Sequence, residues 1–464
     1  MRLFNSKKYR VLSVFIAAIM LFASMTATAF ANDYTQEDLE ALREIIVDFY
    51  VDPLTTDMLP GETPQEIFSN LDEHSVYYTA KEFEGLFQRY TGDYAGIGAY
   101  IIEEDGKIII ERPIEGSPAE RAGLLPGDEI YSVDGEIIRG LNAAEGAERV
   151  KGPVGTKVTL GIIRGNNERV IEFTIVRANI TNNPVSYEII DDIGYIKIEE
   201  FNGHAYENFA KAVGQLAEQR VKQAIIDLRD NPGGGLEEVV KIARLLVPPS
   251  PIVHIGYRGF DYTYASFSTL KPFDDIVVLV NEYSASASEI LAAAVQDTGS
   301  GTIIGKNTYG KGTVQQIFGL TNDEGFKITV ARYLSPNRNI IDGRGVIPDI
   351  EVERLPQDIQ IEEFLPISYS NTYSLGDVSS EIAGVQQRLR ALGYNITDKA
   401  GVLDQGTLDA INTFAKDYEL EEMTDLTTEM QSAIEYIFVS KLYSKEYDLQ
   451  LKAALEYIKE GFKR

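Results

Sequence analysis

The sequence predicts a multidomain α/β protein with a layered core, a smaller β-rich domain and helical segments at either end. The chain has 464 residues, enough for about three domains of ~150 residues each. Residues 179–355 alternate short apolar runs with helix-like segments, which is typical of strands and helices packed in layers. A hydrophobic content of 44% excludes a largely disordered or low-complexity chain.

The composition excludes several kinds of functional site. There is no cysteine, and hence no disulfide, no thiolate nucleophile and no cysteine-ligated metal. The three histidines, His74, His204 and His254, are far apart in sequence and form no HExxH motif. We therefore expect neither a metal nor a cofactor. The net charge of −28 disfavours nucleic acid as a partner, because phosphate backbones are themselves negative.

Residues 1–31 have the organisation of an export signal. Residues 1–10 are basic, Val11–Phe22 is an apolar run, and small residues stand at Ala29 and Ala31 as in a cleavage site. The stretch is also long enough to span a bilayer, so an uncleaved anchor stays open as the alternative. In both cases we expect the remainder to be exported, either secreted or held at the extracytoplasmic face of the membrane.

Residues 33–90 predict helices. Leu42, Ile45, Ile46 and Phe49 recur at helical spacing after an acidic first turn. A segment of this kind can cover a core or pair with another chain.

Residues 91–178 consist of short β-like runs separated by Gly and Pro. The expected strands are 97–102, 107–112, 129–133, 157–164 and 169–176. The run Ser117–Ile130 holds one short helix and two turns, and the glycine-containing stretch Gly96–Ala99 precedes it. Together these segments resemble the PDZ domain in its bacterial protease-associated form.

The PDZ resemblance implies a site for a peptide C-terminus. Glycines allow consecutive backbone N–H groups to converge on a carboxylate, and the neighbouring strand edge can accept a peptide. By this resemblance the carboxylate-binding residues are Gly96, Ile97, Gly98 and Ala99. A small β-domain without a ligand is the alternative.

Two helical units are expected at the C-terminus. Residues 375–438 repeat short helices and tight turns and resemble the peptidoglycan-binding-type three-helix domain, with Ala415 where that family has Gln. Glycan contact and a scaffolding role both stay open for this unit. In residues 439–464 the stretch Asp448–Ile458 is an amphipathic helix that we expect to dock on the chain or on a partner subunit.

The expected α/β core consists of alternating strands and helices. Its predicted strands are 185–190, 193–198, 224–228, 276–280 and 302–304, and its predicted helices are 205–219, 236–246 and 287–295.

Three motifs lie in this core. Asp227–Gly235 follows a strand and ends in three glycines with bare N–H groups. Ser284–Glu289 opens a helix, where backbone N–H groups and the helix dipole favour an oxyanion. In Lys311–Gln315, a strand conformation would place Lys311, Thr313 and Gln315 on one face.

In this order, behind a PDZ-like region and the segment Leu71–Ser75, the motifs resemble the carboxyl-terminal-processing (tail-specific) serine proteases of peptidase family S41. The likeness covers nearly the whole mature chain. It implies a ClpP/crotonase-like α/β protease core in residues 179–370. It also implies that Ser286 is the nucleophile, Lys311 the general base and Gln315 the residue that orients the lysine amine. The backbone N–H groups of Gly233 and Ala287 would form the oxyanion hole.

A lysine base agrees with the chemistry of a chain that has so few histidines. A serine hydroxyl needs an adjacent base, and a lysine can act as that base only when its amine is uncharged. The lysine pKa must therefore fall far below its usual ~10.4, which burial achieves. His204 and His254 are the rival bases in a Ser-His interpretation, although His254 stands in a strand-like run. Ser284 and Ser288 are predicted to have capping and packing roles.

The resemblance implies further partners and regulation. The substrates would be proteins with accessible apolar C-terminal tails, and the N-terminal helices with the Asp448–Ile458 helix would make a homodimer. The PDZ domain would gate the core, with Lys151 standing where the family has Arg and Arg149 as a second candidate. The alternative from another functional class is a catalytically inert PDZ and wall-binding scaffold.

Overall fold

A computed structural model describes residues 34–104, 106–165, 169–356, 364–396, 399–442 and 444–461. The chain divides into two compact units. The smaller runs to Asp48 and includes Leu54–Leu71, and the larger consists of Phe49–Pro53 and of the chain from Asp72 onward. The expected export signal, residues 1–31, lies outside the described residues. Within those ranges, no helix combines the length and apolar character that a bilayer span requires.

The smaller unit is helical, as expected. It contains most of α2 (Gln36–Phe49), a 3₁₀ turn η1 (Thr56–Met58) and α3 (Pro64–Phe68). Leu39, Leu42 and Ile46 are buried along one face of α2, at the spacing of an amphipathic helix. Arg43 donates to the carbonyl oxygens of Leu59 (2.8 Å) and Gly61 (2.5 Å), and so fixes the loop between the helices.

The core of the larger unit is a six-stranded sheet. Its strand order is β10 (Val185–Ile190), β11 (Ile193–Ile198), β12 (Gln223–Asp227), β15 (Asp275–Val280), β16 (Thr302–Gly305) and β19 (Ile350–Glu351). β10 is antiparallel to β11 and every other pair is parallel. Most residues of β12 and β15 are buried and apolar, which is expected of parallel strands covered on both faces.

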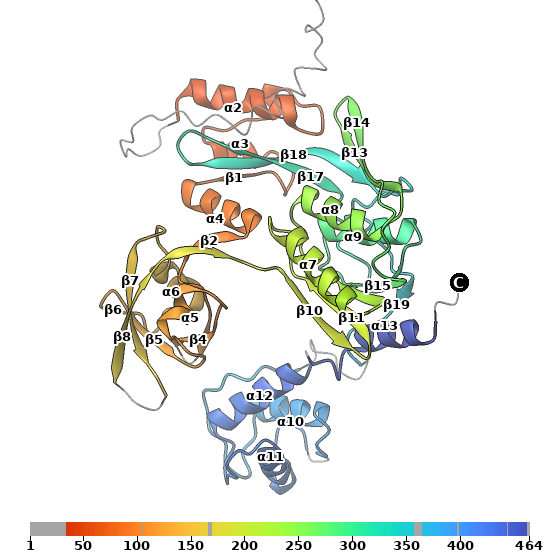
Figure 1. The fold of residues 1–464 in the computed structure, drawn as a ribbon. Coiled ribbons are helices and arrows are strands. Elements are labelled where there is room, and N and C mark those ends of the chain that lie inside the picture. The colour runs from red at the N-terminus through yellow and green to blue at the C-terminus, as the bar shows by residue number, and fades with distance from the viewer. Residues whose placement is uncertain are drawn as a thin grey trace, which may run out of the picture. The chain divides into compact units, whose positions relative to one another are not determined.

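A second sheet packs above the helices that cover the first (Figure 1). Its order is β1 (Val76–Tyr78), β18 (Gly325–Leu334), β13 (Ser250–Tyr257) and β14 (Phe260–Ser266), and β17 (Thr313–Gly319) also pairs with β18. The helices are α7 (Ala205–Glu218), α8 (Leu236–Leu246) and α9 (Ala287–Asp297). α9 contacts both β13 and β16, so it lies between the two sheets.

The second sheet is where the sequence-based expectations were incomplete. Residues 33–90 were expected to be helical, and they do include α4 (Ala80–Thr91), but Val76–Tyr78 forms the strand β1 instead. This strand pairs with β18, about 250 positions away in the chain, through Val76↔Lys327 and its neighbours. Lys311 does not belong to a strand either, because β17 begins at Thr313.

The β-rich segment forms its own sheet and core. The sheet order is β3 (Ala99–Glu104), β4 (Lys107–Pro113), β5 (Glu129–Val133), β7 (Lys157–Ile163) and β8 (Val170–Val176), with β6 (Glu136–Ile137) beside β5. The helices α5 (Pro118–Ala122) and α6 (Ala143–Val150) complete it. The chain enters and leaves through an antiparallel pair, β2 (Asp93–Gly96) and β9 (Ala178–Thr181). The strand expected at 97–102 starts only at Ala99, because Gly98 turns the chain with φ 78°.

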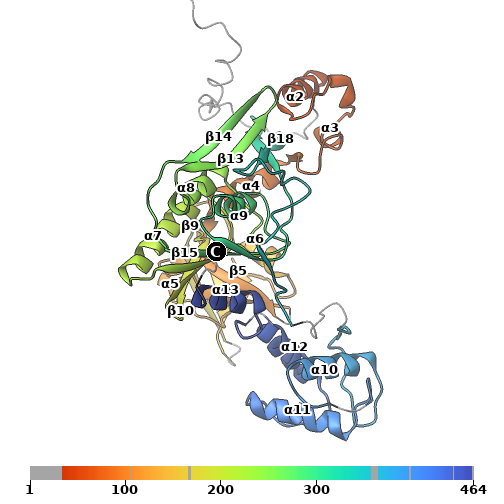
Figure 2. The ribbon, with the colours of Figure 1, turned by 90° about the vertical axis from the view of Figure 1, so that its right-hand side faces the viewer.

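The small C-terminal helical domain contains α10 (Ser380–Ala391), α11 (Gln405–Asp417) and α12 (Thr428–Leu442) (Figure 2). Phe414 and Ala415 are both fully buried in its apolar core. Ala415, which stands where the resembled family has Gln, therefore packs inside the domain.

After this domain the chain returns to the six-stranded sheet as α13 (Leu449–Lys459). Leu451, Ala454 and Ile458 of α13 pack in one cluster with apolar side chains of the six-stranded sheet, namely Ile193, Ile225, Val277, Leu279 and Ile304. The expected amphipathic helix thus docks on its own chain. The helical domain is consequently an insertion between β19 and α13.

A buried ion cluster anchors the start of α13. Arg229 donates to Asp227 (2.9 Å, Nε to Oδ1), to Asp448 (2.8 Å, Nη1 to Oδ1) and to Gln450 (3.1 Å, Nη1 to Oε1). All four side chains are buried, and Asp448 also caps α13 by accepting the N–H of Leu451 (2.9 Å). Burial would raise the pKa of Asp227, but the Arg229 guanidinium outweighs it and holds that pKa below its usual range.

We expect the apolar face of α13 to contribute strongly to the stability of the core. Leu451→Ala should lower the free energy of unfolding by about 2–5 kcal/mol, because it leaves a cavity between helix and sheet. Urea unfolding measures the effect. Glu456→Ala, on the exposed face of the same helix, is the control and should change the stability by less than ~0.5 kcal/mol. Equal effects of the two changes would show that the α13 interface does not stabilise the core.

Candidate active site

Ser286 stands at the N-terminus of α9, in the turn that follows β15. Its backbone has φ 55° and ψ −112°, in the positive-φ region that residues other than glycine rarely adopt. Such a conformation costs about 1–3 kcal/mol and persists only where the surroundings enforce it. Ser284 and Ser288 are fully buried and donate to the carbonyls of Leu228 (2.8 Å) and Asn231 (3.0 Å). Ser286 is the one serine of this motif that is not buried.

The carboxylate of Glu289 holds the backbones of Ser286 and Lys311 together. Its Oε2 accepts the N–H of Ser286 and the N–H of Lys311, each at 2.8 Å. Its Oε1 accepts the Thr308 hydroxyl (2.6 Å) and the Gly310 N–H (2.7 Å). Glu289 is fully buried, and this burial raises its pKa although the four hydrogen bonds favour the charged form.

Tyr333 of β18 holds the same two residues from their carbonyl side. Its hydroxyl hydrogen is shared between the carbonyl oxygens of Ser286 (3.2 Å) and Lys311. Tyr333 is almost completely buried, with 1% of its surface exposed. The N–H and C=O groups of both residues are therefore fixed by two buried side chains, one from α9 and one from β18.

The pKa of Lys311 lies below its usual value. Burial is the main cause, and the positive charge of Lys327 adds to it. Asp72, Glu289 and Glu73 act in the opposite direction but do not outweigh these two causes. Within the described residues Lys311 Nζ has no hydrogen-bond or ion-pair partner, so its lone pair can act as an acceptor when the amine is neutral.

Gln315 lies on β17 near Thr313 and Thr329. Its Nε2 donates to the hydroxyls of Thr313 (2.9 Å) and Thr329 (3.3 Å). Thr329 in turn donates to Asp72 Oδ1 at 3.0 Å. The structure thus brings Gln315 into a hydrogen-bonded chain that ends on Asp72, in the segment before β1.

The two expected oxyanion donors differ in their availability. A Cβ on Gly233 would lie 2.8 Å from Ser286 Cβ and 3.1 Å from Ala287 N, so Gly233 does lie beside both residues. The Gly233 N–H, however, donates to Asn231 Oδ1 at 2.8 Å and is not free in this conformation, because Asn231 forms a tight local turn. The N–H groups of Ala287 and Gly234 have no acceptor in the part of the chain that the structure describes.

A pocket of about 480 Å³ opens beside Lys311. It is lined by Lys311 with His74, Asp230, Pro232, Tyr283, Ala285 and Tyr309. Tyr283 and Tyr309 are more than half exposed, so the pocket has an aromatic rim. Across the described ranges, no three His, Asp or Glu side chains converge in a way that could hold a metal ion.

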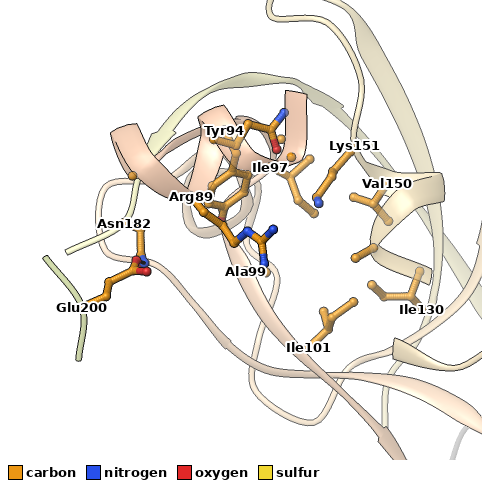
Figure 3. A pocket seen from close by; sticks show the side chains of 16 residues that line it. Arg89, Tyr94, Ile97, Ala99, Ile101, Ile130, Val150, Lys151, Asn182 and Glu200 are labelled. Atoms are coloured by element: carbon orange, nitrogen blue, oxygen red, sulfur yellow. Dashed lines mark hydrogen bonds between the residues drawn. The ribbon is translucent and has the colours of Figure 1, made fainter. Parts of the chain in front are cut away.

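A second pocket, of about 460 Å³, lies at the Gly96–Ala99 loop. Ile97, Ala99, Ile101, Ile130 and Val150 give it an apolar wall (Figure 3). Gly98 is required at its position, because a Cβ there would lie 2.4 Å from Ser117 Cβ. The N–H groups of Ile97 and Gly98 donate to no other group among the described residues, so this loop can still accept an anion.

Comparison with known proteins identifies the family. A sequence model of peptidase family S41 matches residues 192–352, and a PDZ-domain model matches residues 109–164. The carboxy-terminal processing protease CtpB of Bacillus subtilis is 32% identical over 451 residues, which are 94% of this chain and 92% of the relative. This chain belongs to peptidase family S41. It is a C-terminal processing serine protease with a PDZ domain.

A second sequence relative agrees with this assignment. The carboxyl-terminal-processing protease of Synechocystis sp. is 37% identical over 321 residues, which are 65% of this chain and 75% of the relative. Among solved structures, the photosystem II D1 C-terminal processing protease aligns with 25% identity and a TM-score of 0.44, covering 72% of this chain and 95% of its own. Since the sequence relatives are peptidases, the alternative of an inert scaffold is not favoured.

The two gating candidates of the protease lie at the end of α6. Arg149 is exposed and pairs with Glu136 (2.9 Å) inside the PDZ domain. Lys151 pairs with Glu148 (3.2 Å), which also pairs with Lys81 of α4 (3.1 Å). Lys151 lines the apolar pocket together with Arg89 of α4. Lys151 is thus the candidate that adjoins the carboxylate loop.

The rival histidine bases of the protease are engaged elsewhere. His204 interacts with Asp93 (3.1 Å), and the two ring nitrogens of His254 face the Thr263 hydroxyl (2.7 Å) and the Pro336 carbonyl (3.1 Å). His74 is the histidine that lines the pocket of Lys311. Burial, together with the Lys311 charge, lowers the His74 pKa.

Sequence reasoning missed four residues of this site: Asp72, Glu289, Thr329 and Tyr333. Asp72 and Glu289 stand inside motifs that the sequence analysis singled out, but without a role. Thr329 stands between two buried apolar residues of β18, whereas Tyr333 follows the exposed Arg332. A polar residue in an apolar run is the pattern that could have drawn attention to Thr329, and Tyr333 carries no such signal.

We expect Lys327→Gln to raise the pKa of Lys311. Lys327 disfavours the charged form of Lys311, so its removal should move the Lys311 titration to higher pH. NMR titration of isotope-labelled lysine side chains measures the change directly. Lys306→Gln is the control, because Lys306 is neutralised by Glu351 and Glu353 and should leave the Lys311 titration in place. An unchanged Lys311 titration in Lys327→Gln would mean that the two charges do not interact.

Proposed function

We propose that this protease is an exported serine endopeptidase that captures protein C-terminal tails on its PDZ domain and cleaves with Ser286, Lys311 and Gln315. The observation that supports the catalytic role is that Glu289 and Tyr333 each hydrogen-bond to the backbones of both Ser286 and Lys311. These two buried side chains keep a strained serine and a lysine of lowered pKa next to each other. No other described serine combines a positive φ with a helix N-terminus.

The reaction follows from the chemistry of these groups. Neutral Lys311 takes the proton of Ser286 Oγ as the oxygen attacks the substrate carbonyl carbon. The Ala287 N–H, at the first turn of α9, stabilises the oxyanion, and the Gly233 N–H joins it when Asn231 releases that group. The peptide bond then breaks, and the leaving amine receives the proton from Lys311. Water, deprotonated by Lys311, hydrolyses the acyl ester and frees Ser286.

Tail capture is supported by the second pocket. The free N–H groups of Ile97 and Gly98 suit a terminal carboxylate, and the isoleucine-lined wall suits an apolar last side chain. Lys151 and Arg89 add positive charge next to this loop. The substrates we propose are therefore proteins with accessible apolar C-terminal tails, cleaved in regulated proteolysis or quality control at the membrane.

We also propose export, dimerisation and wall contact. Export rests on the signal-like residues 1–31, either cleaved or kept as an anchor. A homodimer would use the N-terminal helices, because the apolar face of α13 is already buried in its own chain. Peptidoglycan contact by residues 375–438 rests on the resemblance of that segment alone.

The test compares the mature chain with its Ser286→Ala form on a flexible protein substrate that ends in an apolar residue. We expect cleavage by the first form and a loss of at least about a thousandfold in the second, since the serine is the nucleophile. Amidation of the substrate's C-terminus should slow cleavage by the unaltered protease. Equal cleavage by the Ser286→Ala form would contradict the proposed nucleophile.

Gly98→Ala provides the matching change on the protease side. The added methyl group collides with Ser117, so the preference for a free carboxylate should disappear. Gly116→Ala is the control, because Gly116 has a similar φ of 70° but open space around it. A preserved preference in Gly98→Ala would place tail recognition elsewhere.

A further inference from the structure

The orientation of the Gln315 amide is determined by a chain of hydrogen bonds that begins at Asp72. A carboxylate can only accept hydrogen bonds, so the Thr329 hydroxyl must donate its single hydrogen to Asp72 Oδ1 (3.0 Å). Thr329 Oγ1 is then left as an acceptor toward Gln315. The amide must present its Nε2 to Thr329, as the 3.3 Å contact shows.

Asp72 is ionised at neutral pH, so it cannot donate a hydrogen bond, and Thr329 must be the donor in the bond between them. Burial would raise the pKa of Asp72, but hydrogen bonds from Tyr50, Ser75, the His74 N–H and Thr329 outweigh it and hold the pKa below its usual value. Ser75 donates to Asp72 Oδ2 (2.9 Å) and accepts the Thr329 N–H (3.0 Å). Asp72 and Thr329 are therefore held in register by Ser75.

The consequence for Gln315 concerns its carbonyl oxygen. Both hydrogens of Nε2 are used, one by Thr313 (2.9 Å) and one by Thr329. Among the described residues Oε1 accepts no hydrogen bond, so the amide keeps a free acceptor on its other side. An acceptor of this kind can orient a lysine amine, whereas a flipped amide would present N–H groups and repel it.

We propose that Asp72 is a positioning residue of the protease, which acts through Thr329 to keep the Gln315 carbonyl available to Lys311. The inference rests on the proposed function, in which Lys311 is the base. It assigns a role to the segment Leu71–Ser75, which lies more than 200 positions before Lys311 in the chain. The proposal also gives a role to Thr329, a polar residue of β18 with only 1% of its surface exposed.

The test separates the charge of Asp72 from its hydrogen-bond role. Neutral Lys311 is the active form, so kcat/KM rises with pH as Lys311 loses its proton. The charged groups that act on Lys311 are Lys327, which lowers its pKa, and Asp72, Glu289 and Glu73, which raise it; His74 also faces it. Removing a negative charge near Lys311 lowers its pKa and should move the rise to lower pH.

Three variants then give three different profiles. Glu73→Gln removes a charge but no link of the chain, so the rise should move to lower pH with the same high-pH plateau. Thr329→Val removes the hydroxyl that links Asp72 to Gln315 but removes no charge. The high-pH plateau of kcat should therefore fall about tenfold or more, the effect of losing one oriented hydrogen bond. KM should stay nearly unchanged. Asp72→Ala removes both the charge and the acceptor oxygens, so it should show both effects.

Further arms exclude a mere folding defect. Thr329→Ser keeps the hydroxyl and should restore the plateau, and rates are referred to the fraction of Ser286 that reacts with an organophosphonate. The double variant Asp72→Ala with Thr329→Val should lose no more plateau than either single change, because both break the same chain. A Thr329→Val plateau equal to that of the unaltered protease, or an Asp72→Ala profile identical to that of Glu73→Gln, would overturn the inference.

The experiments distinguish failure of the positioning role from failure of the proposed function. Cleavage that depends on Ser286 and Lys311 but not on Thr329 or Asp72 would remove only the positioning role. Cleavage that persists in Ser286→Ala would remove the proposed function, and the inference with it.

Discussion

The site depends on one buried carboxylate. Glu289 accepts four hydrogen bonds, and two of these come from the backbones of Ser286 and Lys311, which are 25 positions apart in the chain. These bonds help to offset the cost of ~1–3 kcal/mol that a serine pays at positive φ. Tyr333 completes the hold from β18 by bonding the two carbonyl groups. The two sheets of the core therefore meet in the site, one through the turn after β15 and the other through the strand that carries Tyr333.

The same burial that fixes the backbone also prepares the chemistry. Lys311 loses part of its affinity for a proton because it is withdrawn from water and faces Lys327. The neighbouring carboxylates of Asp72, Glu289 and Glu73 oppose this lowering of the Lys311 pKa without outweighing it. A lysine base needs no histidine and no metal, which suits a chain with three histidines and no cysteine. The Gly233 N–H, held by Asn231, shows that one part of the expected site is not yet arranged for an oxyanion.

The sequence predicted those elements whose signal is local. The bounds of α8 and β11, and nearly those of β12 and β15, follow from runs and spacing of apolar residues, and α8 also begins directly after Gly235. The second sheet was largely missed, because its strands mix polar and aromatic residues and β1 pairs across about 250 positions. Motifs and a family resemblance predicted Ser286, Lys311 and Gln315 as catalytic residues, and the structure gives them the hydrogen-bond partners on which the proposal rests. Asp72, Thr329 and Tyr333 were not predicted, because only the folded sheet brings them to the site.

The central claim is that Lys311, whose pKa is lowered by burial, activates Ser286 in its neutral form. The most direct test is the rate at which an organophosphonate labels the protein as pH varies, with the labelled residue located by mass spectrometry. We predict a single adduct on Ser286, a rate that rises with one ionisation below the usual lysine pKa, and no labelling in Lys311→Met. Labelling of another serine, or labelling of Ser286 that survives Lys311→Met but is lost in His74→Ala, would contradict the account.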